Sequence, residues 1–328
     1  MNTTGNQKKA ISEEYDIHGI MNALEGKEEM DPDLHDGSYQ MMRAVIEAYA
    51  DLPDLSTVDY HDLNLVYLTT VGTWKHGIDA KKKTIDESHL KPDDKEYLKE
   101  LWDEVWQKAV DGEFISAYMD DYDTQRIGMF GTGFFSFQNK TTAEDVRKFI
   151  GMCIDILPME EDKDMFRRAE SVFTGPFKGM QAASASMVLH CLKPFTFPIL
   201  NTNMGFRNIF ELLGVQLTRT YYLDAYINNC RKIRDFRNRN FSWRNYRIFD
   251  LAAHRTDKYI KKNSDPAKAA EEGKTTEEVR LETTVNARVR EEFMQQIREK
   301  EKELEEVERK RLDLQKEIEL LEGMLKRI

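Results

Sequence analysis

The chain has little cysteine, and neither its cysteines nor its histidines are spaced for a metal centre. The 328 residues include three cysteines, Cys153, Cys191 and Cys230, which lie far apart and form no Cys-x-x-Cys pair. The 7 histidines are also dispersed, with no His-x-x-x-His pair. Zinc and iron–sulfur sites need several thiolate or imidazole ligands at close spacing. We therefore expect reduced cysteines, no structural metal and no cofactor.

Long apolar runs are also missing. No segment approaches the roughly 20 apolar residues that a helix needs to cross a bilayer. The first residues, MNTTGNQKKAISEEYDIHG, contain no apolar core of a secretory signal, so we expect a cytoplasmic protein without a membrane partner. The loop G-x-x-x-x-G-K-[ST] is absent as well, which excludes a P-loop nucleotide motor.

A surplus of acidic residues gives a net charge of -11, but the charges are unevenly distributed. The segment RKIRDFRNRNFSWRNYR (231–247) carries seven basic residues against one aspartate. A polyanion responds to charges within a Debye length of about 8–10 Å, so this local surplus predicts contact with DNA phosphates. The alternative is that the segment pairs with the chain's own acidic residues. The expected phosphate contacts are Arg231, Arg234, Arg237, Arg239, Arg244 and Arg247.

Helical periodicity dominates residues 39–253, which we interpret as the main domain. Apolar residues recur there at steps of three and four, the spacing of one face of an α-helix. Thr141 or Thr142 before Glu144 forms a capping arrangement. Alternating strand patterns are few, and residues 126–138 are the best hairpin candidate. We therefore predict a mainly α fold, with helices over residues 39–52, 61–74, 95–110, 143–157, 181–192 and 203–214.

Polar and charged segments flank this domain. We interpret residues 1–38 as an N-terminal extension and residues 254–283 as a polar linker. In residues 284–328, mostly apolar residues follow a 4-3 alternation from Phe293 to Ile328, surrounded by Glu, Lys and Arg. That repeat is typical of a coiled coil and favours a homodimer. The alternatives are a single solvated helix and a helix that folds back onto the body.

The stretch FKGMQAASASMVLHCL, followed by FPILNTNMGFRNIFELLG, resembles the helix-hairpin-helix DNA glycosylase superfamily. In that family a glycine hairpin leads into a helix of small residues, and a proline-containing segment then delivers a polar residue and an arginine. A glycine turn at a helix start can bind a phosphate through backbone N–H groups, aided by the helix dipole. The resemblance implies double-stranded DNA as the partner, contacted by Gly179, Gln181, Asn203 and Arg207.

The same resemblance places Asn201 at the position of the family's catalytic aspartate. Bifunctional members carry a lysine nucleophile in the helix after the hairpin, where this chain has Ala182, Ala183 and Ser184. Any chemistry would therefore use a water oriented by Asn201, as in a monofunctional glycosylase, and not a Schiff base. The alternative is a protein that binds DNA without catalysis.

A second resemblance covers residues 68–90, 127–137 and 245–254. These segments are similar to amino-terminal modules of McrB-like restriction GTPases and related phage-defence proteins. Those modules recognise DNA, often with modified bases. The resemblance implies a role in antiviral defence, with the predicted coiled coil standing where the GTPase motor would follow.

Aromatic residues near glycines and lysines predict a pocket for an extruded base. Trp74, Phe134 and Phe135 are suited to stack on a base or to line its pocket, with Lys75 at a phosphate. The alternative for the aromatic side chains is the hydrophobic core. His190, on an apolar helix, is expected to be a core histidine and not an acid or a base.

Three functional hypotheses follow from these patterns. The first is a DNA glycosylase-like enzyme of phage defence that flips a base, modified in our interpretation, and hydrolyses its N-glycosidic bond at Asn201. The second is a non-catalytic module that recognises modified DNA and recruits a nuclease or motor through its coiled coil. The third is a coiled-coil scaffold whose globular part binds only protein.

Overall fold

The structure is a computed structural model of the 328-residue chain. It describes residues 19, 37–71, 75–111, 136–174, 177–200, 210, 212–242, 245–247 and 249. The chain divides into two compact units, and all described residues belong to one of them, Asn2–Asp257. In this described part, eight helices have defined bounds and no strand is present, which confirms a mainly helical fold.

Several predicted features lie outside the described residues. They are the linker 254–283, the coiled coil 284–328, residues 126–135 of the hairpin candidate, and the extension 1–38 apart from residues 19, 37 and 38. Of the predicted helix 203–214, the structure describes only residues 210 and 212–214.

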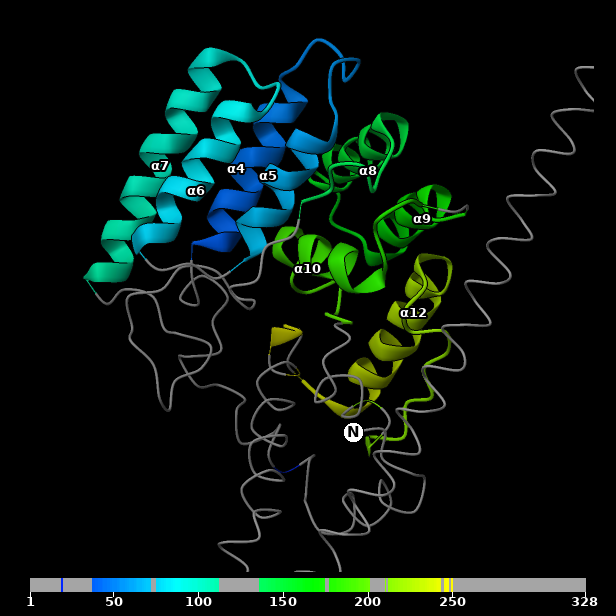
Figure 1. Cartoon of the computed structure of the whole chain (residues 1–328). Helices are drawn as coiled ribbons and strands as arrows, with labels where there is room; N and C mark the ends of the chain where they lie inside the picture. Colours follow the sequence, from blue (N-terminus) through cyan, green and yellow to red (C-terminus); the bar gives the residue numbers. More distant parts are fainter. Residues whose placement is uncertain are drawn as a thin grey trace, which may run out of the picture. The chain divides into compact units, whose positions relative to one another are not determined.

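The first four helices form one bundle. They are α4 (Ser38–Ala50), α5 (Tyr60–Thr70), α6 (Lys75–Glu87) and α7 (Pro92–Val110). Each packs against the next, and α7 packs back against α4, so the four helices surround a shared core (Figure 1). Buried side chains from all four belong to one apolar cluster, among them Met42, Leu63, Ile85 and Trp102.

Local sequence signals define where these helices begin. α5 starts with a capping box, in which the Asp59 side chain accepts a hydrogen bond from His61 N and the Asp62 side chain accepts one from Asp59 N. α7 starts at Pro92, whose missing N–H needs no partner at the first helical position. Two aspartates in its first turn offset the positive end of the helix dipole.

A buried lysine satisfies the carboxyl end of α5. Lys81 Nζ donates hydrogen bonds of 2.8 Å to the carbonyl oxygens of Leu68 and Val71. It also lies 4.4 Å from the centroid of the Trp102 ring, a favourable position for a cation over an aromatic face. Two carbonyl groups at a helix end, where intrahelical partners run out, thus gain a hydrogen-bond donor inside the core.

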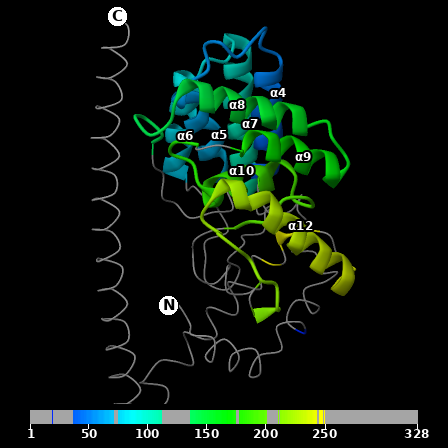
Figure 2. The same cartoon turned by 90° about the vertical axis from the view of Figure 1, so that its right-hand side faces the viewer.

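The second half of the unit packs around α10. It contains α8 (Ala143–Ile156), α9 (Asp162–Val172), α10 (Ala182–Leu192) and α12 (Leu223–Asn240). α10 contacts α4 and α5 of the bundle on one side and α12 on the other, while α8 contacts α4, α5 and α9 (Figures 1 and 2). Every residue of α10 except Ala183 is buried, because its alanine and serine side chains let neighbouring helices approach closely.

The helix predictions are confirmed for α4, α5, α7, α8 and α10, with ends that differ by a few residues. Thr142 is the N-cap of α8, and its side chain accepts a hydrogen bond from Asp145 N. The sequence did not predict α9, since it lies in an acidic stretch and buries only Met165, Phe166 and Ala169. The three cysteines are buried and form no disulfide, as expected.

Candidate functional site

The connection from α9 to α10 makes a glycine turn at the predicted hairpin. Gly179 is exposed and has φ +80°, a left-handed conformation that a side chain disfavours. A Cβ atom at this position would lie 2.4 Å from the carbonyl oxygen of Lys140. The turn therefore needs glycine for two reasons, the backbone conformation and the close approach of the chain before α8.

The start of α10 lies directly after this turn. Gln181 is exposed and is the N-cap, but its side chain makes no capping hydrogen bond. The N–H group of Ala182 donates to the carbonyl oxygen of Tyr221 at 3.2 Å. The N–H groups of Ala183 and Ser184 have no acceptor among the described residues. Such first-turn N–H groups and the helix dipole favour an anion.

Two exposed lysines flank the same turn. Lys178 precedes Gly179 in the chain, and Lys140 supplies the backbone that the glycine contacts. Both lysines belong to the segments that form this turn, so they bring positive charge to the region before a helix start that favours an anion. We define the α10 turn as the turn at Gly179 together with Lys140, Lys178 and the first residues of α10.

Arginines of α12 pair with acidic residues of the same unit. Arg231 forms a bidentate ion pair with Glu170 of α9, in which its two Nη atoms donate to the two carboxylate oxygens at 2.8 and 2.6 Å. Arg234 bonds the neighbouring Asp235 at 3.0 Å, and Arg239 Nε donates to the carbonyl oxygen of the same residue. For Arg231 and Arg234 the structure therefore matches the alternative in which the basic segment pairs with the chain's own acidic residues.

The burial of Arg237 and Arg247 contradicts the prediction that their side chains contact DNA. Arg237 is only 3% exposed; its guanidinium donates to the carbonyl oxygen of Phe195 and lies 4.5 Å from the centroid of the Tyr246 ring. Arg247 is fully buried. Both side chains belong to the interior, so neither forms part of a surface that DNA could contact.

His190 is a core histidine, as predicted. The residue is buried, with Nδ1 2.9 Å from the carbonyl oxygen of Phe197 and Nε2 3.2 Å from the hydroxyl of Tyr39. Because the carbonyl can only accept, Nδ1 carries the proton and Nε2 accepts from Tyr39. Burial, which disfavours the charged ring, lowers the pKa of His190 to about 3.

This shift predicts a pH-dependent stability. An unfolded histidine takes up a proton near pH 6.5, whereas the folded His190 does so only near pH 3. Below pH 6.5 the unfolded state therefore binds one more proton, so stability that is present above pH 6.5 is lost as the pH falls toward 3. Between pH 7 and pH 5 we expect the free energy of unfolding to fall by about 2 kcal/mol more in the wild type than in His190→Gln. Urea unfolding at both pH values measures this, and equal losses would contradict the prediction.

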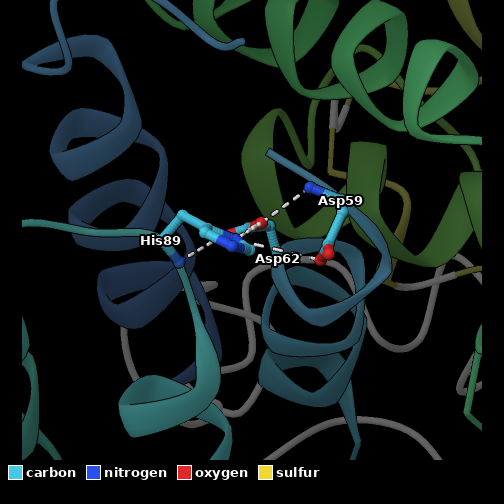
Figure 3. A group of neighbouring side chains, drawn as sticks. All are labelled: Asp59, Asp62 and His89. Atoms are coloured by element: carbon cyan, nitrogen blue, oxygen red, sulfur yellow. Dashed lines mark hydrogen bonds and ion pairs between the residues drawn. The ribbon is translucent and has the colours of Figure 1, made fainter. Parts of the chain in front are cut away.

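A second polar cluster joins α4, the start of α5 and the segment before α7. The buried Asp62 side chain accepts four hydrogen bonds, each 2.8 Å long. Its Oδ1 accepts from the Tyr49 hydroxyl and His89 N, and its Oδ2 from Asp59 N and His89 Nδ1. Figure 3 shows Asp59 and the His89 ring on either side of Asp62. Burial and the nearby Asp62 raise the pKa of Tyr49, which keeps its phenol a donor.

The same cluster has the residue types of a metal site. Ligand atoms of Asp59, Asp62 and His89 lie within 4.8 Å of one another. However, each Asp62 oxygen already accepts two hydrogen bonds. His89 Nδ1 donates one of these four bonds. A metal ion would have to replace that proton and compete with these donors. Since hydrogen bonds account for the whole arrangement, we assign the cluster a structural role.

The remaining predicted site residues are outside the described part of the chain. These are Trp74, Phe134, Phe135, Asn201, Asn203, Arg207 and Arg244. Lys75 is the first residue of α6, but its side chain is not described. The described Phe137, next to the predicted pocket residues, is buried against Tyr67, with ring centroids 5.5 Å apart.

Two features of the site had no signal in the sequence. The contact of Tyr221 with the start of α10 is a backbone hydrogen bond, which leaves no residue pattern. The partners Asp62 and His89 are 27 residues apart, and no sequence motif links them. Only the fold brings these residues together.

Comparisons of the chain with protein-family models, with curated proteins and with solved structures find no match. Within the described ranges, no helix has the length and apolar character to span a bilayer. A function for the chain therefore rests on the geometry of its described sites and on the resemblances in its sequence.

Proposed function

We propose that the helical unit is a DNA-binding domain that holds a backbone phosphate at the α10 turn, as the resemblance to helix-hairpin-helix glycosylases implies. The observation that carries the proposal is Gly179, whose left-handed backbone packs on Lys140 directly before a helix start that has no side-chain cap. N–H groups without an acceptor, a helix dipole and two exposed lysines all favour the same ligand, an oxyanion on a repeating backbone.

The arginines of residues 231–247 take a smaller part in this proposal than the sequence suggested. Arg231 is engaged by Glu170, and Arg237 and Arg247 are buried. Arg239 is exposed at the last turn of α12 and is the remaining described candidate for a phosphate contact. The α10 turn is the primary contact.

Charge reversal at the α10 turn tests the proposal. We expect Lys178→Glu to weaken binding of the full-length protein to a fluorescent duplex by about 5- to 30-fold, because a charged hydrogen bond to phosphate contributes about 1–2 kcal/mol. The slope of log affinity against log salt should become shallower by about 1, since one phosphate contact is lost. Fluorescence anisotropy at several salt concentrations measures both quantities.

The control carries the same charge change at a distant position, on a helix of the first bundle. Lys108 lies on α7 and pairs with Glu104 at 2.8 Å, and Lys108→Glu should leave DNA affinity within about twofold of the wild type. Equal weakening by both variants would indicate a general effect of net charge. The proposal fails if the wild-type protein shows no salt-dependent DNA binding.

Base removal is the enzymatic extension of the proposal. The resemblance places Asn201 at the reaction centre, where it would orient a water toward the N-glycosidic bond. The test incubates modified and unmodified duplexes with wild type or Asn201→Ala and then treats them to cleave abasic sites. The result distinguishes a glycosylase from a module that only binds DNA. Cleavage that requires Asn201 supports a glycosylase, whereas intact DNA with retained binding supports a recognition module.

A further inference from the structure

Two adjacent tyrosines are exposed on the segment that leads into α12. Tyr221 and Tyr222 are 43% and 58% exposed and are among the few large apolar side chains of the described part that face solvent. Aromatic rings of this size are ordinarily buried, or placed at a surface where they bind something.

The segment is held firmly by its own hydrogen bonds. The buried side chain of Asn229 binds both backbone groups of Thr218, accepting from its N–H at 3.1 Å and donating to its carbonyl at 2.8 Å. Lys232 Nζ donates to the carbonyl oxygen of Gln216 at 3.1 Å. The turn closes through Tyr222 N and the carbonyl oxygen of Arg219 at 3.0 Å. The exposure of the tyrosines is therefore imposed by a fixed backbone.

Arg219 shows that this presentation has a conformational cost. Its φ is +47°, a left-handed conformation that is unfavourable for a residue with a long side chain. From there its guanidinium lies 4.8 Å from the centroid of the Tyr222 ring and 2.9 Å from Asp224. The strained residue thus fixes the turn and places a planar cation against the tyrosine ring.

The tyrosines adjoin the α10 turn. The carbonyl oxygen of Tyr221 accepts the hydrogen bond from Ala182 N, and Ala182 follows Gly179 by three residues. A chain of three residues spans at most about 11 Å, so the two features can contact neighbouring parts of one ligand.

We propose that Tyr221 and Tyr222 form a stacking platform for unpaired bases of the nucleic-acid strand whose phosphate lies at the α10 turn. This inference rests on the proposed DNA-binding function and specifies its ligand as a strand with exposed bases. Lys178, which is exposed and directly precedes Gly179, provides positive charge toward such a strand, which carries one phosphate per nucleotide. The charge of Arg219 is already paired with Asp224. Aromatic side chains beside basic residues are the arrangement by which proteins bind single strands without reading sequence.

The experiment compares three fluorescent DNAs with the full-length protein: a single strand, a fully paired duplex and a duplex with a short unpaired gap. We expect Tyr222→Ala to weaken binding to the single strand and the gapped duplex at least about fivefold, because a stacking contact is lost. Binding to the paired duplex should change by less than twofold. Tyr222→Phe, which keeps the ring, should bind like the wild type.

Tyr97→Ala is the matched control, since Tyr97 is 56% exposed on α7. Equal affinity of Tyr222→Ala and wild type for all three DNAs would overturn the platform. If Lys178→Glu still weakens binding in that case, the α10 turn remains a DNA site and only the stacking inference fails. If the wild type binds none of the three DNAs, the proposed function fails first.

Discussion

Asp62→Ala is expected to destabilise the helical unit by about 3–5 kcal/mol, the range for removing one partner of a buried charged network. Asp62 is fully buried and is the common acceptor for Tyr49, Asp59 and His89. Alanine leaves these donors without an acceptor in a place where water cannot fully replace it. It also removes half of the capping box that starts α5.

Urea unfolding of the full-length protein, followed by circular dichroism, measures this loss. Asp103→Ala is the control, because Asp103 pairs with Lys82 on the surface and should contribute at most about 1 kcal/mol. Tyr49→Phe removes a single donor and should cost about 1 kcal/mol. A chelator should leave the wild-type midpoint unchanged if hydrogen bonds stabilise the cluster. A chelator-induced loss would instead reveal a metal ion at Asp59, Asp62 and His89.

Gly179→Ala is expected to cost about 3 kcal/mol or more. Alanine at φ +80° carries a conformational penalty of about 1–2 kcal/mol. The new Cβ would also lie 2.4 Å from a backbone oxygen of Lys140, so the turn or the chain before α8 must move. Since this turn is the proposed phosphate contact, DNA affinity should fall together with stability.

Gly214 provides a matched control within the same unit. Its φ is +79°, but a Cβ added there would meet nothing within 4 Å. Gly214→Ala should therefore show only the conformational penalty, about 1–2 kcal/mol, and leave DNA affinity unchanged. The difference between the two variants isolates the contact with Lys140. Equal losses of stability would show that this contact has no energetic effect.

Local patterns were enough to predict much of the helical architecture. Residues 143–157 and 181–192 show helical periodicity, and α8 and α10 form there. Thr142 caps α8 because a threonine followed by acidic residues favours a helix start in any fold. His190 could be predicted as a core residue, since its neighbours on an apolar helix leave it no exposed face.

The arginine side chains of residues 231–247 could not be placed in the same way. Arg231, Arg237 and Arg247 look alike in a basic segment, yet the first pairs with Glu170 and the other two are buried. Arg237 meets the carbonyl oxygen of Phe195, which is 42 residues away in the chain. Charge counts along a sequence contain no information about such distant partners.

The sequence by itself determined that this chain is rich in helices, that α10 is apolar, and that a glycine precedes it. Hydrophobic periodicity and capping act over a few residues, so they can be recognised in the sequence alone. Only the tertiary structure decided which arginines are buried, that Asp62 meets His89, and that two tyrosines stand beside the glycine turn. Those outcomes depend on packing between distant segments, because burial and hydrogen bonding are set by neighbours in space.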